Sequence, residues 1–251
     1  MTVAAWLGLA ASCFIAALLQ ATNGFGFAVL AVPFFLLLAP PGQAIAAITI
    51  ISLATSLFVM PELYRSIDAG LLRRLTIGSL AALPVGLFAS VHANPTIVEL
   101  VAGVTVSLFA VILAWYRARR HAGAVAMRPG RDLAVGAIAG VATALVGMAG
   151  PPVLIYLMLA GAPMRTVRAT LIGFFALVYA ATIAANVVFV GMRGSTWLLA
   201  ASLLPLVWLG GRIGLRVGDR MGEAAAAALA LTVLGVIGLY TLADAARAAL
   251  W

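Results

Sequence analysis

The chain has 251 residues, of which 65% are hydrophobic and only 9% are charged. This composition excludes an ordinary soluble domain, which is about half apolar and a quarter charged. The formal net charge of +8 comes from arginines in short segments between apolar runs, a pattern that sets membrane topology and argues against nucleic-acid binding. We therefore predict an all-α polytopic membrane protein that is embedded in a lipid bilayer and has no nucleic-acid partner.

The first half of the chain, residues 1–120, predicts one long apolar block followed by three membrane-spanning helices. The block covers 3–39 and contains the stretch QATNGFGFAVLAVP, in which Asn23, Gly24 and Gly26 interrupt the apolar run. Glycine and asparagine are unfavourable in a helix interior, so this stretch predicts a break or the tip of a helical hairpin. The three helices are expected at about 44–61, 71–91 and 96–116.

The basic segment 121–131 predicts a cytoplasmic linker between this first transmembrane repeat and a second repeat at 132–251. The second repeat begins with an apolar block at 132–161 that contains LVGMAGPP, in which Gly147 and Gly150 precede or adjoin two prolines. This stretch predicts a second helix break. Three further helices are expected at about 168–190, 195–215 and 224–245.

The two halves of the chain repeat each other in order and partly in sequence. A shift of 123 positions aligns Gly24 with Gly147 and Pro40 with Pro163. If each long block crosses the membrane once, ten arginines lie on the side of the linker and five on the other side; if each block is a hairpin, the division is thirteen to two. Because arginine is enriched on the cytoplasmic side, the hairpin topology is favoured. It places both termini outside and makes the two repeats inverted.

Inverted repeats with interrupted helices point to the substrate site of a transporter. If the two hairpin tips meet near the middle of the membrane, helices that start near Phe27 and Pro151 direct free N–H groups at one shared spot, which suits a small anion. The residues expected to bind this anion lie at the tips and on the helices that follow them: Gln20, Thr22, Asn23, Gly24, Gly26, Ser52, Gly147, Gly150, Tyr179 and Asn186. The alternative is that the glycines of the tips only allow close helix packing, as the spacing of Gly210, Gly214 and Gly218 predicts for that segment.

Ionisable residues are rare within the predicted spans. Glu62, Glu99 and Asp244 fall near predicted helix ends, so no carboxylate within the membrane points to proton coupling. Arg212 is the deepest arginine, and it either attracts an anion at the cytoplasmic mouth or extends to the membrane interface by snorkelling. The sequence has no nucleotide-binding loop, no zinc motif and no catalytic Ser/His/Asp set, so we expect no enzyme activity, cofactor or metal.

The stretch QATNGFGFAVLAVP, followed half a chain later by GMAGPPVLIYLML, resembles the TauE/SafE family of sulfite and organosulfonate exporters. The resemblance covers essentially the whole chain, although the run of three glycines that many members carry at the tips is reduced here to Gly24 and Gly26, and to Gly147 and Gly150. It implies transport, by export across the cytoplasmic membrane, of a small and often sulfur-containing anion. The absence of a nucleotide-binding motif predicts a secondary transporter, and the inverted interruptions favour alternating access. A channel-like anion pathway and a structural membrane protein without transport are the alternatives. A coupled H⁺ or Na⁺ ion and assembly as a homodimer are left open.

Overall fold

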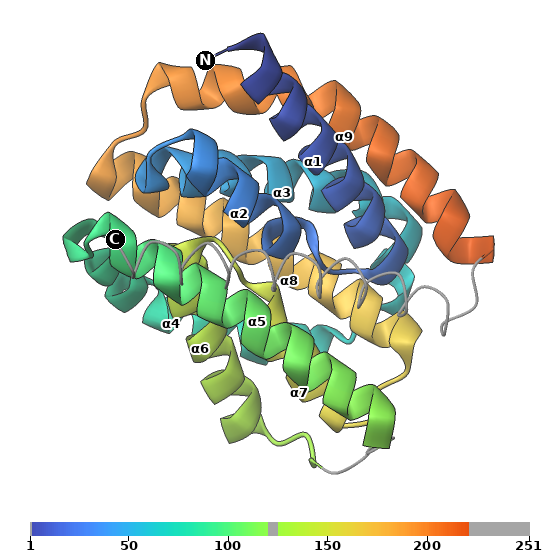
Figure 1. Ribbon diagram of the computed structural model, residues 1–251. Helices are drawn as coiled ribbons and strands as arrows, with labels where there is room; N and C mark the ends of the chain where they lie inside the picture. The colour runs from blue at the N-terminus through green and yellow to red at the C-terminus, as the bar shows by residue number, and fades with distance from the viewer. Residues whose placement is uncertain (1, 120–124, 221–251) are drawn as a thin grey trace.

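The computed structural model describes residues 2–119 and 125–220, and within these ranges the chain is helical without strands (Figure 1). The elements expected in these ranges are present, with ends that differ by a few residues from the predicted ones, whereas the helix expected at 224–245 lies outside the described residues. The elements are α1 (Val3–Asn23), α2 (Phe27–Leu38), α3 (Pro41–Leu63), the 3-10 helix η1 (Tyr64–Ser66), α4 (Ala69–His92), α5 (Pro95–Arg119), α6 (Pro129–Val146), α7 (Gly150–Leu159), α8 (Met164–Ala185), the π-helix η2 (Asn186–Val190) and α9 (Gly194–Arg220).

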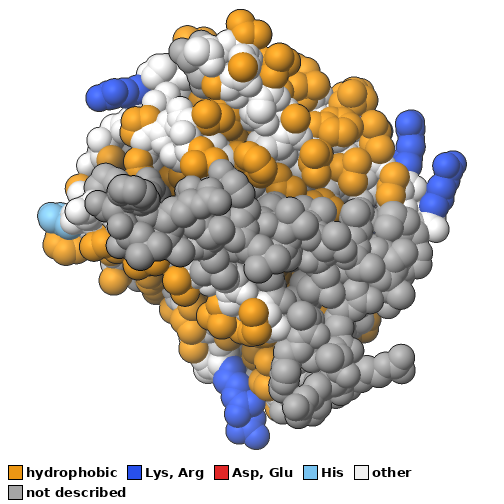
Figure 2. All heavy atoms as spheres, viewed as in Figure 1, with side chains coloured by type: hydrophobic (Ala, Val, Ile, Leu, Met, Phe, Trp, Pro, Cys, Tyr) orange, Lys and Arg blue, Asp and Glu red, His pale blue; other side chains and the backbone are white. Residues whose placement is uncertain are grey.

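The described helices have the lengths and surfaces of membrane-embedded elements. Six candidate spans, built on α1, α3, α4, α6, α8 and α9, are long and apolar enough to cross a membrane, and α2 and α7 are shorter apolar helices. Large hydrophobic side chains such as Phe88, Phe189 and Leu198 are exposed, and Figure 2 shows hydrophobic atoms over much of one face. Because an apolar surface of this extent is stable only against lipid or another apolar partner, the structure agrees with a multi-pass membrane protein.

Two glycine breaks divide the long apolar blocks into helical hairpins. α1 ends at Gly24 and α2 begins after Gly26, and the φ angles of these glycines are +82° and +110°. α2 then packs back along α1. α6 ends at Gly147, with a φ angle of +73°, and α7 begins at Gly150 with prolines in its first turn. Since a residue with a Cβ is strained at positive φ, these glycines determine where the helices break, and the predicted interruptions are confirmed.

Helices of the first half pack closely against helices of the second half. The closest pairs are α1 with α9 and α4 with α6, and α3 also packs against α8. A Cβ placed on Gly210 would lie 2.5 Å from the carbonyl oxygen of Phe14, and one placed on Gly86 would lie 2.8 Å from Cα of Val141. Glycine therefore allows these helix backbones to touch. The prediction that the glycines at 210, 214 and 218 serve packing is confirmed, because all three face α1.

Most of the described arginines lie at one end of the bundle. α9 runs parallel to α1 and α6 parallel to α4, because their contacting residues advance together along both helices. α3 and α8 run in opposite directions, since Glu62 and Arg168 line one cavity whereas Ile45 and Asn186 line another. The end at which α1 meets α2 is called the arginine end, and the arginines there are Arg65, Arg73, Arg74, Arg128, Arg131, Arg165, Arg168, Arg212, Arg216 and Arg220. Arg193 lies at the opposite end.

Candidate functional site

The first hairpin tip, residues 24–26, lies against the beginning of α8. A Cβ placed on Gly24 would lie 2.6 Å from Cα of Arg168, so only glycine fits at this contact. The Arg168 guanidinium donates through Nη2 to the carbonyl oxygen of Ala21, in the last turn of α1. The last carbonyls of a helix have no intrahelical partner and carry partial negative charge, which favours a cation beside them. An arginine of the second half therefore holds the first tip at the arginine end.

The second hairpin tip, at Gly147, lies against the beginning of α3 and the middle of α8. A Cβ placed on Gly147 would lie 3.5 Å from Cγ2 of Ile45, which is an ordinary contact. The carbonyl oxygen of Gly147 accepts a hydrogen bond from the Tyr179 hydroxyl at 3.4 Å. A Cβ placed on Gly150 would lie 3.2 Å from the ring of Phe175. The second tip thus has more space beside it than the first, and its backbone faces a polar side chain of α8.

The two tips do not meet, which corrects the expectation of one shared spot between them. The first tip contacts α8 at Arg168 and the second at Phe175 and Tyr179, seven and eleven residues further along, which corresponds to roughly 10–16 Å of helix. On α3, likewise, Gln20 reaches Ser56, about three turns beyond the Ile45 contact of the second tip. The physical reason is helix length: α1 has 21 residues, enough to cross about 30 Å of hydrocarbon before it breaks. The two tips therefore lie at different heights along the axis of the bundle.

A buried set of polar side chains extends from one of these heights to the other. We call it the central polar group: Gln20, Ser52, Ser56 and Tyr179. Nε2 of Gln20 donates to Oγ of Ser56 at 3.1 Å, and this hydroxyl donates to the carbonyl oxygen of Ser52 at 2.8 Å. The Ser52 hydroxyl lies near that of Tyr179, but it has no hydrogen bond of good geometry among the described residues. All four residues are at most 2% exposed. Since a buried polar atom without a partner costs about 1–3 kcal/mol, Ser52 is a position where a polar ligand would supply a missing partner.

Asn23 and two helix N-termini add further hydrogen-bond donors near the tips. Nδ2 of Asn23 is buried and has no hydrogen-bond partner in the described part of the chain. The first turns of α2 and α7 receive no side-chain cap, but Pro151 and Pro152 have no N–H group, so α7 offers fewer backbone donors than α2. Uncapped N–H groups at a helix N-terminus favour an anion. Within residues 2–119 and 125–220, no group of three or more His, Cys, Asp or Glu side chains could hold a metal ion.

Three of the predicted site residues lie apart from the central polar group or have another role. Oγ1 of Thr22 is 3.0 Å from the carbonyl oxygen of Gly214, so Thr22 joins α1 to α9. Asn186 donates through Nδ2 to the carbonyl oxygen of Thr182 at 2.9 Å and lines a cavity at the end opposite the arginine end. Gly26 supplies the positive φ angle from which α2 starts.

Two cavities lie at opposite ends of the bundle. The larger, of about 530 Å³, is opposite the arginine end, and its lining includes Gln43, Asn186 and Arg193. The smaller, of about 210 Å³, lies at the arginine end and is lined by Glu62, Leu63, Arg168, Arg212, Leu215 and Arg216. The buried central polar group lies between the two ends. This arrangement has a cavity at each end and a closed polar layer in the middle.

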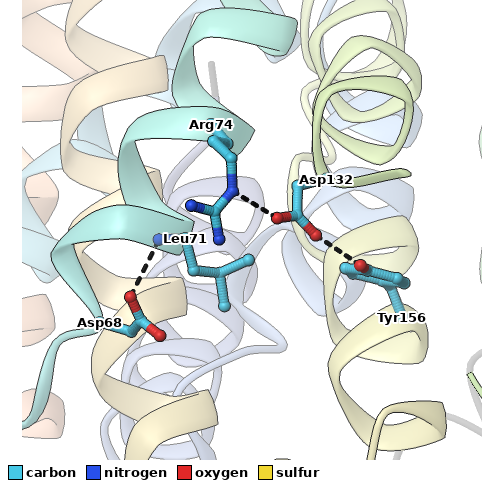
Figure 3. A network of polar contacts seen from close by, with 5 residues as sticks. All are labelled: Asp68, Leu71, Arg74, Asp132 and Tyr156. Carbon is cyan, nitrogen blue, oxygen red and sulfur yellow. Dashed lines mark hydrogen bonds and ion pairs between the residues drawn. The ribbon is translucent and has the colours of Figure 1, made fainter. Parts of the chain in front are cut away.

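A buried ion pair that the sequence pattern does not reveal joins α4, α6 and α7 (Figure 3). Asp132 is fully buried; its Oδ2 lies 2.5 Å from Nε of Arg74, and its Oδ1 accepts a hydrogen bond from the hydroxyl of Tyr156. In the sequence, Asp132 stands beside the basic segment at the start of a predicted helix, where a carboxylate is usually exposed. The sequence feature that could have pointed to a structural role for Asp132 is its location in the first turn of α6, because a carboxylate there interacts favourably with the helix dipole.

A family model described as "Sulfite exporter TauE/SafE" matches residues 9–241 of the chain. The match includes both hairpins, the central polar group and both cavities, so every element of the candidate site lies within the matched region. No curated protein and no solved structure matches the chain significantly.

Proposed function

We propose that this chain, which belongs to the sulfite exporter TauE/SafE family, is a secondary transporter that exports a small sulfur-containing anion by alternating access. Sulfite and small organosulfonates are the proposed substrates. The observation that carries the proposal is the buried central polar group between two cavities at opposite ends. A transporter of this type exposes its site to one side at a time, so a closed polar layer between two openings suits that mechanism.

An inverted relation between the two halves is part of the proposal. Gly24 lies against Arg168 of α8, and Gly147 lies against Ile45 of α3. Gly147 and Arg168 follow Gly24 and Ile45 by the same 123 positions. Each tip therefore contacts the equivalent point of the opposite half, as expected if a two-fold axis in the membrane plane relates the repeats 1–120 and 132–251.

Within each half, the first hairpin and the second tip contact equivalent residues of the helix that follows, although Gln20 and Gly147 are not themselves equivalent. Gln20 of the first hairpin meets α3 at Ser56, and the second tip meets α8 at Tyr179, which is 123 positions after Ser56. Two equivalent conformations of the halves would then differ in which tip is close to the central polar group. Exchange between these conformations would open one cavity toward the substrate while closing the other.

The arginine end is proposed to face the cytoplasm, with the linker 121–131 on the same side. The arginines of the described helices gather there, whereas Arg193 lies at the opposite end. Arginine and lysine are enriched in cytoplasmic segments of membrane proteins, so this distribution supports the assignment. The N-terminus of α1 then lies outside, and the protein resides in the cytoplasmic membrane.

The substrate is proposed to bind between the two tips, beside the central polar group. Donors at the two heights would serve the anion in turn: the Asn23 amide and the uncapped N-terminus of α2 at the first tip, and the Ser52 hydroxyl near Tyr179 beside the second. Gly147 and Gly150 leave space beside the second tip. Neutral donors bind an anion less strongly than buried cations do, which allows its release on the other side.

The driving force is proposed to be an electrochemical gradient: that of the anion itself, the membrane potential or a coupled H⁺ or Na⁺ ion. The chain carries no nucleotide-binding motif that would allow ATP to drive transport. A channel would need a continuous opening, which the buried central polar group does not provide.

Flux measurements on purified protein in proteoliposomes test this function. The panel contains sulfite, sulfoacetate, sulfate and a carboxylate, and liposomes without protein serve as the control. We expect saturable movement of sulfite or an organosulfonate in the absence of ATP. A requirement for ATP would refute the mechanism, and movement of only cations or neutral solutes would refute the anion assignment.

A further inference from the structure

The cavity at the arginine end has a composition that the central site does not share. Its volume is about 210 Å³, and we call it the arginine pocket. It is lined by Glu62, Leu63, Arg168, Arg212, Leu215 and Arg216. We propose that the arginine pocket is an anion-loading site, which takes a small oxyanion from the cytoplasm before the anion reaches the central polar group. This proposal rests on the proposed transport function, and it adds a second site that captures the same substrate.

Charge is the first reason for this assignment. Three arginines from α8 and α9 face one glutamate of α3, so the lining carries an excess of positive charge. A concave, partly apolar site concentrates the field of such charges and raises the local concentration of an anion. Guanidinium groups bind oxyanions through paired N–H donors, whereas halide ions cannot use that geometry. The chemistry therefore selects a small anion with two or more acceptor oxygens.

The size of the arginine pocket suits a small anion. Its volume of about 210 Å³ is roughly seven times the volume that one water molecule occupies in the liquid. This space admits an inorganic oxyanion with part of its hydration shell, or a sulfonate with a short carbon chain.

Arg168 connects the arginine pocket to the first hairpin tip. The side chain lines the pocket, and its Nη2 donates to the carbonyl oxygen of Ala21 at the end of α1. The backbone of Arg168 also packs closely against this tip, because a Cβ placed on Gly24 would lie 2.6 Å from Cα of Arg168. An anion in the pocket would compete with the Ala21 carbonyl for the same guanidinium. Loading would therefore weaken a contact that holds the tip in place.

Arg212 provides an optical signal for occupancy. Its guanidinium carbon lies 5.4 Å from the centroid of the Trp208 ring, a cation–π distance. An anion bound to Arg212 would change the electrostatic environment of this indole. Fluorescence from Trp208 should therefore report binding without any transport, once the other four tryptophans have been replaced by phenylalanine.

The phosphate of an anionic lipid has the same chemistry as a free oxyanion, and the arginine pocket lies near the expected membrane interface. The experiment must therefore separate these two sources. Vesicles of pure phosphatidylcholine lack an anionic headgroup, whereas vesicles with added phosphatidylglycerol supply one.

The test compares Arg212→Gln/Arg216→Gln with a double variant of equal charge change, Arg65→Gln/Arg73→Gln, which alters exposed arginines of the same end outside the pocket. Sulfite uptake is measured in vesicles of both orientations. Sulfite binding is measured from Trp208 fluorescence in Arg216→Gln, which keeps the Arg212–Trp208 contact that gives the signal. We expect the pocket variant to raise the KM for sulfite at the arginine end roughly tenfold or more. The KM at the opposite end should not change, and the control should resemble the wild type.

The possible outcomes distinguish this proposal from the proposed function. An unchanged KM in the pocket variant, or an equal rise in the control, overturns the loading site while transport itself stands. If the wild type moves no anion, the proposed function fails, and binding alone decides. Weaker sulfite binding in Arg216→Gln but not in the control supports the site, and unchanged binding in Arg216→Gln overturns it. An effect seen only with phosphatidylglycerol assigns the pocket to a lipid headgroup and also overturns the proposal.

Discussion

Asp132 and Arg74 form an ion pair with an Oδ2–Nε distance of 2.5 Å, in which the carboxylate is fully buried and the side chain of the arginine is 32% exposed. The pair joins α4 of the first half to α6 of the second half, along one of the closest helix contacts in the bundle. Tyr156 of α7 donates to the same carboxylate, so the second hairpin is attached through it as well. This contact therefore ties the position of the second hairpin to the first half.

Replacement of Arg74 alone should lower the free energy of unfolding more than replacement of both Arg74 and Asp132. Arg74→Gln leaves a buried carboxylate without its cation, which typically costs about 3 kcal/mol of unfolding free energy. Arg74→Gln/Asp132→Asn should recover part of this loss, because no buried charge remains. Unfolding in mixed micelles measures both variants, with Arg73→Gln as an exposed control. An effect of Arg74→Gln within about 0.5 kcal/mol, as at ordinary surface positions, would contradict this interpretation.

The glycines of the two tips should differ in their tolerance of a methyl group. Gly24→Ala places Cβ 2.6 Å from Cα of Arg168 at a φ angle of +82°, so we expect poor folding. Gly147→Ala meets only ordinary contacts at a φ angle of +73°, so its cost should be about 1–2 kcal/mol from the backbone conformation alone. Expression yield and thermal unfolding in detergent measure both. Equal tolerance at the two positions would show that the first tip is not held against α8.

The unpartnered donors near the tips should matter more for substrate than for stability. Asn23→Ala and Ser52→Ala remove a buried amide nitrogen and a buried hydroxyl that have no hydrogen-bond partner in the described structure, so the change in the free energy of unfolding should be small. If these groups bind the anion, each loss should raise the sulfite KM severalfold, corresponding to about 1 kcal/mol. Ser12→Ala is the matched control, since Ser12 is buried but bonded within α1. Wild-type KM values in both variants would remove these residues from the site.

The topology can be tested by labelling from each side of the membrane. Single cysteines at positions 2 and 125, in a Cys13→Ala background, lie before α1 and before α6. Because α1 and α6 start at opposite ends of the bundle, we expect the two cysteines to react with an impermeant reagent from opposite sides. Labelling of both from the same side would rule out the inverted arrangement.

The sequence predicts the helices and their breaks because those features have local causes. Apolar runs of sufficient length specify spans, and glycines that adopt positive φ specify where α1 and α6 end. The packing role of Gly210, Gly214 and Gly218 also follows from spacing alone. Both the spans and the packing glycines depend on residues close together in the chain.

The heights of the two tips and the identity of their neighbours depend on tertiary packing, which spacing does not encode. The first tip passes the middle of the bundle because α1 continues for 21 residues, and it meets Arg168 only because α8 runs antiparallel to α3. Asp132 is buried because α4 and α7 cover it, although its place next to a basic segment suggests exposure. The arginine pocket likewise arises where three helices that are distant in sequence converge.

A counterflow measurement tests the central claim of alternating access most directly. Proteoliposomes are loaded with a high concentration of unlabelled sulfite and diluted into a trace of labelled sulfite, without ATP. Because one site serves both sides in turn, we expect the label to accumulate transiently inside above its equilibrium level, at a rate that saturates with concentration. Label that only equilibrates, at a rate that rises linearly with concentration, would identify a channel and contradict the proposed mechanism.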